Sequence, residues 1–122
     1  MKKRVLIIDD DPDFLDVLGS ILEKSGVEVQ TCAYGEEGLD LIRQTVPDLV
    51  VLDVFMPGIH GLQALRQLRH DPQTARVPVI VVSSMPWSEL EPVSAELDAD
   101  FVDKGATTQV VAARVKKKLG LG

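Results

Sequence analysis

Cysteine is nearly absent from this chain, since Cys32 is the only one in 122 residues. A single thiol excludes an intramolecular disulfide and a cysteine-rich zinc site, which agrees with a reducing compartment. Long apolar runs are also missing, because the run Val5–Ile8 is followed at once by Asp9 and is too short for the apolar part of a secretory signal. We therefore interpret Cys32 as a core residue and expect a cytoplasmic protein.

Positive charge is scarce as well. Thirteen Lys and Arg residues stand against nineteen Asp and Glu residues, which gives a net charge of -6. The chain as a whole is repelled by nucleic-acid phosphates and by anionic membranes, so we expect no direct nucleic-acid binding and no membrane binding. The basic run Lys116–Lys118 lies near the end of the last expected helix, where positive charge complements the helix dipole. Docking of an acidic partner is a secondary interpretation of that run.

Apolar residues are plentiful enough for one compact core, at 45% of the chain. Short apolar runs alternate with segments whose apolar residues recur at helical spacing, which indicates an α/β fold. Four of the five strand-like runs look apolar on both faces, as buried parallel strands do. These runs are Val5–Ile8, Val27–Cys32, Leu49–Leu52, Val79–Val82 and, as the weakest, Phe101–Val102.

Five helical segments are expected between and after these strands. Asp11 and Pro12 predict the start of the first helix and Gly26 its end. The fourth helix is expected to be short, because Pro86 and Pro92 interrupt the segment before Phe101. No long linker or repeat is visible, so we expect one domain over residues 1–122 and no output domain. The other apolar helix positions are Leu15, Leu18, Leu22, Leu39, Ile42, Leu62, Leu65, Leu68, Val111, Val115 and Leu119.

Acidic residues follow two of the expected strands where those strands end. Asp9, Asp10 and Asp11 follow the first strand and Asp53 follows the third. Functional groups of an open parallel sheet collect at the carboxyl ends of its strands, so these carboxylates converge if the two strands are neighbours. Their repulsion then calls for a divalent cation, and an all-oxygen ligand set suits Mg²⁺, with Mn²⁺ as a substitute. The alternative is that the acids end a strand and cap a helix, which is the role we assign to Asp11.

Four segments resemble, in order, the signature blocks of the response-regulator receiver family. They are Ile7–Pro12 with its acid pair, Asp48–Gly61 with Asp53 before Met-Pro-Gly, Val77–Ser83 with its hydroxyl, and Ala99–Lys104 with its lysine. The match spans nearly the whole chain, and the joint order and spacing are far more specific than any one block. The resemblance implies a flavodoxin-like, doubly wound five-stranded parallel sheet of order 2-1-3-4-5 with five flanking helices.

The resemblance also implies residue roles. Asp53 would be the phosphoacceptor, which attacks the phosphorus of a phosphohistidine on a sensor histidine kinase or phosphotransfer protein, or that of a small phosphodonor. Asp10 would bind the metal together with Asp53 and the backbone carbonyl of Phe55, while Asp9 would act through a metal-bound water. Ser83 would then hydrogen-bond the phosphoryl group, although the neighbouring Ser84 could do the same.

Lys104 and Phe101 complete the implied switch. Lys104 would pair with the phosphoryl group, and Phe101 would rotate inward behind the hydroxyl. The surface of the fourth helix, fifth strand and fifth helix would change for a downstream protein whose identity the sequence does not give. Taken alone, Lys104 reads as an ordinary exposed lysine and Phe101 as a half-buried strand residue.

Some positions depart from the family pattern. Gly105 replaces the usual proline after a cis bond, and a cis non-proline bond costs about 2.5 to 4 kcal/mol, so the Lys104–Gly105 bond is expected to be trans. Trp87 is either a partner contact, which we favour slightly, or a core plug. Phe55 and Met85 are both apolar near the expected path of attacking water, which predicts slow self-hydrolysis.

These residues bear on three candidate functions. The first is a phosphorylatable switch that catalyses only its own phosphorylation and dephosphorylation and is otherwise not an enzyme. The second is a phosphatase, which would need a second acid two residues after Asp53, where Phe55 stands. The third is a pseudo-receiver that acts as a fixed interaction module; the complete set of acids, hydroxyl and lysine disfavours it, and Gly105 keeps it open.

Overall fold

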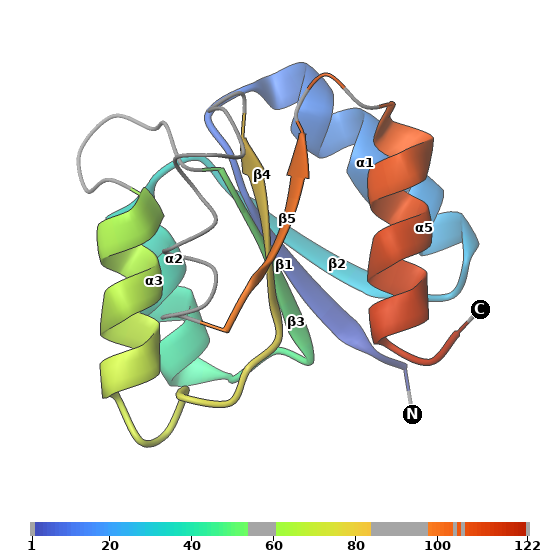
Figure 1. The fold of residues 1–122 in the computed structure, drawn as a ribbon. Helices are drawn as coiled ribbons and strands as arrows, with labels where there is room; N and C mark the ends of the chain where they lie inside the picture. The colour runs from blue at the N-terminus through green and yellow to red at the C-terminus, as the bar shows by residue number, and fades with distance from the viewer. Residues whose placement is uncertain (1, 54–60, 84–97, 104, 106, 122) are drawn as a thin grey trace.

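The computed structural model describes residues 2–53, 61–83, 98–103, 105 and 107–121. Strands and helices alternate along the chain (Figure 1). Their bounds are β1 Arg4–Ile8, α1 Pro12–Lys24, β2 Glu28–Cys32, α2 Gly35–Gln44, β3 Leu49–Asp53, α3 Gly61–His70, β4 Val79–Ser83, β5 Asp100–Asp103 and α5 Thr108–Lys118.

The five strands form one parallel sheet of order β2-β1-β3-β4-β5, which confirms the predicted strand order. β1 lies between β2 and β3, so the strand order reverses at the boundary of β1 and β3. Ile8 is in register with Cys32 on one side and with Leu52 on the other. The carboxyl ends of these strands therefore meet at one edge, where ligands of doubly wound folds bind.

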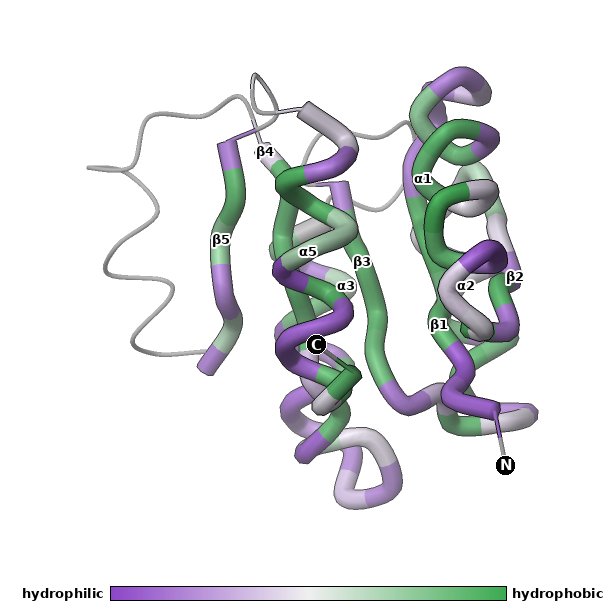
Figure 2. Tube along the Cα trace, turned by 90° about the vertical axis from the view of Figure 1, so that its right-hand side faces the viewer, coloured by the Kyte–Doolittle hydropathy of each residue, from purple (hydrophilic) through white to green (hydrophobic). Residues whose placement is uncertain are grey.

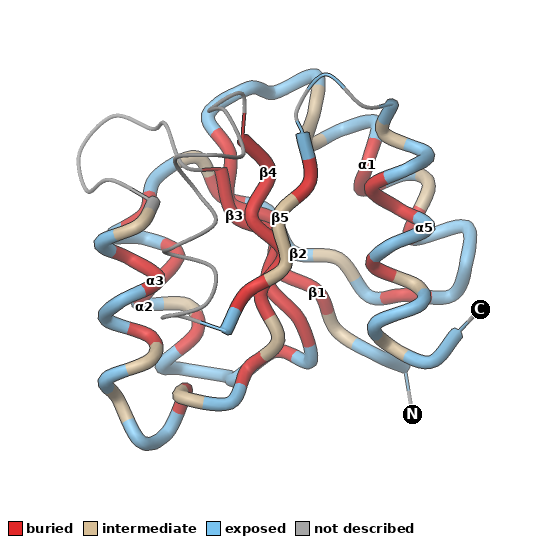
Figure 3. The backbone as a smooth tube through the Cα atoms, viewed as in Figure 1, coloured by how far each residue is buried: buried red, intermediate tan, exposed pale blue. Residues whose placement is uncertain are grey.

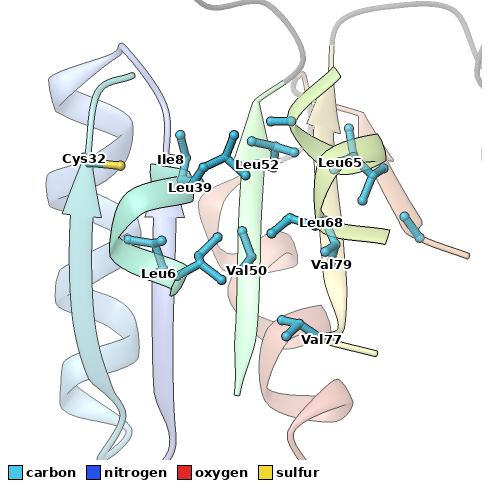
Figure 4. Packing of buried hydrophobic residues seen from close by; sticks show 14 residues of the cluster. Leu6, Ile8, Cys32, Leu39, Val50, Leu52, Leu65, Leu68, Val77 and Val79 are labelled. Carbon is cyan, nitrogen blue, oxygen red and sulfur yellow. The ribbon is translucent and has the colours of Figure 1, made fainter. Parts of the chain in front are cut away.

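The sheet separates two apolar clusters, and consecutive residues of a strand point into opposite ones. Figure 2 shows the mostly hydrophobic strands, and Figure 3 shows that burial is concentrated along them. Leu6 and Ile8 join the cluster under α2 and α3 (Figure 4), whereas Val5 and Ile7 join the cluster under α1 and α5. Because helices cover both faces, the inner strands are buried on both sides and need continuous apolar sequence.

The two edge strands correct the expectation that four strands are buried on both faces. Only β1, β3 and β4 are buried along nearly their whole length. In β2, Glu28, Gln30 and Thr31 are exposed. In β5, Asp100 and Phe101 are half-buried, Val102 is buried and Asp103 is exposed. Each of these strands has a neighbour on one side only, so its outer residues face solvent.

The start of α1 follows its predicted chemistry. Asp11 is the N-cap, its side chain accepts a hydrogen bond from the Asp13 backbone N–H at 3.0 Å, and Pro12 stands in the first turn. Gly26 follows the helix with a φ of 87°, a left-handed conformation that glycine adopts without steric cost.

The described residues contain four helices, so the expected number of five is not confirmed. The short fourth helix was expected in the segment that holds Pro86 and Pro92, and residues 84–97 lie outside the described part of the chain. Within the described part, no helix has both the length and the apolar content needed to cross a membrane.

Cys32 is confirmed as a core residue. Its side chain is 5% exposed and packs in the cluster that contains Ile8 and Leu39. Burial, reinforced by the negative charge of Glu37, raises the pKa of the thiol from 9.0 to about 11, although a hydrogen bond with the backbone of Tyr34 opposes the shift. The folded protein therefore holds the neutral thiol.

This pKa shift predicts a pH dependence of stability. The unfolded chain loses the Cys32 proton near its ordinary pKa of 9.0, before the folded chain does. The contribution of Cys32 is thus complete below that pH and is lost as pH rises towards about 11. We expect the difference in unfolding free energy between wild type and Cys32→Ala, measured in urea, to shrink between about pH 8 and about pH 10.5. A difference that stays constant over this range would contradict the prediction.

Candidate functional site

Three carboxylates converge at the carboxyl edge of the sheet. Ile8 pairs with Leu52 across β1 and β3, so Asp9, which follows β1, lies beside Asp53, which ends β3. Asp9, Asp10 and Asp53 each offer an oxygen atom, and these three atoms all lie within 4.8 Å of one another. The parallel pairing of the two strands produces the convergence that the sequence predicted.

The three carboxylates are not equivalent. Asp9 is 1% exposed and Asp53 is 4% exposed, while Asp10 is exposed. Asp9 is held from both ends: its backbone N–H donates to the Cys32 carbonyl at 3.1 Å, and its Oδ1 accepts from the Asp11 N–H at 2.9 Å. The cluster thus combines two buried acids with one that opens to solvent.

This donor set fits a hard divalent cation. Two oxygen ligands of one Mg²⁺, each at about 2.1 Å, are separated by at most about 4.2 Å. Oxygens that lie within 4.8 Å of one another are close enough for side-chain rotation to bring them around one ion. The exposed Asp10 leaves one side of the cluster accessible to an ion with its water ligands. The arrangement can therefore hold Mg²⁺ or Mn²⁺ beside the Asp53 carboxylate.

Ser83 ends the next strand along the same edge. Asp53 pairs with Val82 of β4, so Ser83 stands one residue beyond the level of Asp53. Ser83 is 1% exposed and pairs with Asp103 of β5. The hydroxyl is therefore on the strand adjacent to Asp53, as its predicted role requires.

Phe101 lies in the middle of β5, in register with Val81. It is half-buried and packs against the cluster under α2 and α3. The predicted positions of Phe55, Lys104 and Trp87 fall outside the described residues, as does the peptide bond between Lys104 and Gly105. Their roles stay predictions.

Arg69 was not singled out by the sequence pattern. Its guanidinium donates hydrogen bonds to the carbonyls of Ala75 and Val77 at 3.2 and 2.7 Å, and to that of Asp98 at 3.0 Å. Asp98 has a φ of 49° and lies just before β5, so Arg69 ties α3 to the start of the strand that carries Phe101. Burial lowers the pKa of Arg69, and the charge of Asp98 opposes this. Helical spacing gives no signal for such a contact, because its partners lie outside the helix, in the segment after α3 and just before β5.

The comparison with known proteins gives one family. The model of the response regulator receiver domain matches residues 5–116. Protein PilH of Pseudomonas aeruginosa is 44% identical over 81 residues, which cover 66% of this chain and 67% of PilH. Two solved receiver domains are similar in fold, and each is 26% identical to this chain. The receiver domain of the Francisella response regulator 1452 has a TM-score of 0.87, with 98% of both chains covered. The BeF3-activated N-terminal receiver domain of Klebsiella pneumoniae RstA has a TM-score of 0.84, with 96% of this chain and 98% of that chain covered.

Both the family match, which spans nearly the whole chain, and the identity to PilH agree with the acid cluster at the sheet edge. The chain belongs to the response regulator receiver domain family.

Proposed function

We propose that the chain is a phosphorylation-controlled receiver that takes a phosphoryl group on Asp53 from a sensor histidine kinase or a phosphotransfer protein. The modified chain then binds a downstream protein or passes the phosphoryl group on, and it works in the cytoplasm. The observation that carries this proposal is the convergence of Asp9, Asp10 and Asp53 within 4.8 Å. The description of the similar RstA receiver domain as BeF3-activated supports control by a phosphate-like group.

Asp53 is proposed as the nucleophile. One of its carboxylate oxygens attacks the donor phosphorus, a new P–O bond forms, and the P–N bond to the donor histidine breaks. The bonding electron pair leaves with the histidine nitrogen, which takes up a proton. Asp53 is suited to this step because it ends a rigid central strand, which keeps its carboxylate in place for in-line attack. We assign no other reaction to the chain.

Asp10 and Asp53 would hold the Mg²⁺ ion directly, with the backbone carbonyl of Phe55 as a third protein ligand by family resemblance. Asp9 is proposed to act through a metal-bound water, because its Oδ1 already accepts a hydrogen bond from the Asp11 N–H. When bound, Mg²⁺ neutralises the neighbouring carboxylates and the charge on the transferring phosphoryl group.

Ser83 and Lys104 are proposed to bind the phosphoryl oxygens after transfer. Phosphorylation adds about -1.5 to -2 charges and three acceptor oxygens, which draws these donors inward. Phe101 then rotates towards the space behind Ser83, and the surface around β5 and α5 changes for a partner, with Trp87 as an additional contact. Because Phe101 has no hydroxyl, recognition there rests on packing.

The metal part of the proposal predicts a large effect of Asp10→Asn. This change removes the one exposed carboxylate of the cluster, so we expect the Mg²⁺ dissociation constant from calorimetry to rise at least about tenfold. Asp13→Asn is the matched control, because Asp13 is an exposed acid in the first turn of α1 and is not part of the cluster. Equal Mg²⁺ affinities for the two variants would remove Asp10 from the metal site.

The direct test of the function is intact mass after incubation with acetyl phosphate and Mg²⁺, with a parallel sample in EDTA. We expect a gain of one phosphoryl group that requires the metal. If neither acetyl phosphate nor histidine-kinase donors label the protein, the fixed interaction module becomes the better description.

A further inference from the structure

The carboxyl half of α5 concentrates positive charge in a chain whose net charge is -6. α5 contains no acidic residue, and its charged side chains are Arg114, Lys116, Lys117 and Lys118. The helix dipole accounts for lysines in the last turn. It does not account for Arg114, which precedes that turn, so the charge pattern extends beyond what helix stability requires.

Three of these cations surround a surface hollow. Arg114, Lys117 and Lys118 line it together with Asp100, the first residue of β5, and its volume is about 470 Å³. Lys118 Nζ lies 3.0 Å from Asp100 Oδ2. Neither Arg114 nor Lys117 has an ion-pair partner among the residues that the structure describes. The lining of the hollow therefore contains one carboxylate and three cations, so its net charge is positive.

The backbone holds this basic surface in a fixed form. Gly120 has a φ of 76°, its N–H donates to the Lys117 carbonyl at 3.1 Å, and the Leu121 N–H donates to the Lys116 carbonyl at 2.8 Å. This pair of bonds is a Schellman motif, which caps a helix end and prevents fraying. The capped end also presents Leu121, which is 46% exposed, as an apolar contact next to the lysines. Figure 2 shows this end of α5 beside the C-terminus.

We propose that the basic surface of Arg114, Lys117 and Lys118 docks an acidic segment of a partner protein. A carboxylate of that segment would lie between Arg114 and Lys117, in the way that Asp100 already pairs with Lys118. Because such contacts are charge-assisted, the specificity of docking and the rate of association depend on the partner's charge pattern.

A protein segment fits this surface better than an anionic membrane does. Charges farther apart than about 8 Å are screened at physiological salt, so a narrow segment that touches only α5 experiences its cations and little of the remaining chain. A flat anionic bilayer would also face the acidic remainder of the protein, whose overall charge is -6. Charge complementarity therefore selects a narrow acidic occupant.

This docking goes beyond the proposed phosphoryl chemistry and does not rest on it. Asp53 pairs with Val82 of β4, which pairs with Val102 of β5. Asp100 precedes Val102 by two residues, so it lies two strands and two residues away from Asp53. With about 4.8 Å between strands and about 3.3 Å per residue, the separation is about 12 Å. The cations of α5 are present whether or not Asp53 carries a phosphoryl group, so the unmodified chain should dock the segment.

The test is fluorescence anisotropy of a labelled short poly-glutamate peptide titrated with the unmodified chain in about 0.15 M salt. We expect saturable binding whose dissociation constant rises about tenfold in Arg114→Gln/Lys117→Gln and less than about twofold in Lys3→Gln/Lys24→Gln. The second variant is the matched control, because it removes two exposed cations and gives the same net charge. Lys118 is kept in both so that its pair with Asp100 remains.

Amide chemical shifts locate the peptide. Changes are expected at Asp100 and at residues 114–118, and none at Asp53. The proposal is overturned by absence of saturable binding at this salt, or by equal losses in the two variants. It is also overturned if phosphatidylserine vesicles bind through Arg114 and Lys117 while the peptide does not, because the occupant is then a membrane. All of these outcomes leave the phosphorylation of Asp53 untouched, since no phosphodonor is present.

Discussion

Asp53→Asn is expected to gain no phosphoryl group from acetyl phosphate and Mg²⁺ under conditions that add one to the wild type. The amide that replaces the carboxylate is a far weaker nucleophile and cannot form the acyl phosphate. It also removes one of the three carboxylates that lie within 4.8 Å of one another. The loss should therefore be complete when measured by intact mass.

The Asp53 variant should remain folded, which separates lost chemistry from lost structure. Asp53 is buried beside Asp9, so an uncharged side chain of the same shape relieves repulsion between them. In EDTA we expect a melting temperature at least as high as that of the wild type. Asp13→Asn is the charge-matched control, and it should be labelled normally because Asp13 lies outside the cluster. A phosphoryl gain on the Asp53→Asn chain would place the acceptor elsewhere.

Gly38→Ala is expected to lower the free energy of unfolding by about 2 kcal/mol. Gly38 lies on the buried side of α2, where the helix approaches β1 closely. An added Cβ would overlap Ile8 Cδ1 and would lie 3.0 Å from Ile8 Cγ1 and 3.3 Å from Cys32 Sγ. Ile8 is 1% exposed inside the cluster of Figure 4, so the added Cβ must displace a buried side chain. Overpacking should therefore outweigh the gain of about 1 kcal/mol in helix propensity.

Gly19→Ala is the matched control within α1. A Cβ at Gly19 would meet Val29 Cγ1 at 3.6 Å, which is an ordinary contact, so this change should stabilise the protein by up to about 1 kcal/mol. Urea unfolding of both variants measures the contrast. Ile8→Val removes the overlapping Cδ1 atom, so the cost of Gly38→Ala should be smaller in the Ile8→Val background. Similar effects of the two glycine substitutions would contradict the close approach of α2 and β1.

The order of the elements was predictable from the sequence because the signals for it are local. Apolar runs mark β1, β3 and β4, the Asp11-Pro12 pair marks the start of α1, and Gly26 marks the chain reversal after that helix. The acids after β1 and β3 could be expected to converge because parallel neighbours align their carboxyl ends. Exposure of β2 was missed although Glu28, Gln30 and Thr31 are polar and the strand order implied by the family resemblance places β2 at an edge of the sheet.

Contacts between distant segments were decided only by the tertiary structure. The unequal burial of Asp9 and Asp10, adjacent in sequence, depends on how the β1 end meets β2 and β3. The need for glycine at position 38 depends on where Ile8 and Cys32 point. The bonds of Arg69 depend on loops brought together by β4 and β5. The sequence by itself thus determined which elements form and which chemistry lies at their ends. The packing of the helices on the sheet decided the distances, because these depend on side chains far apart in the chain.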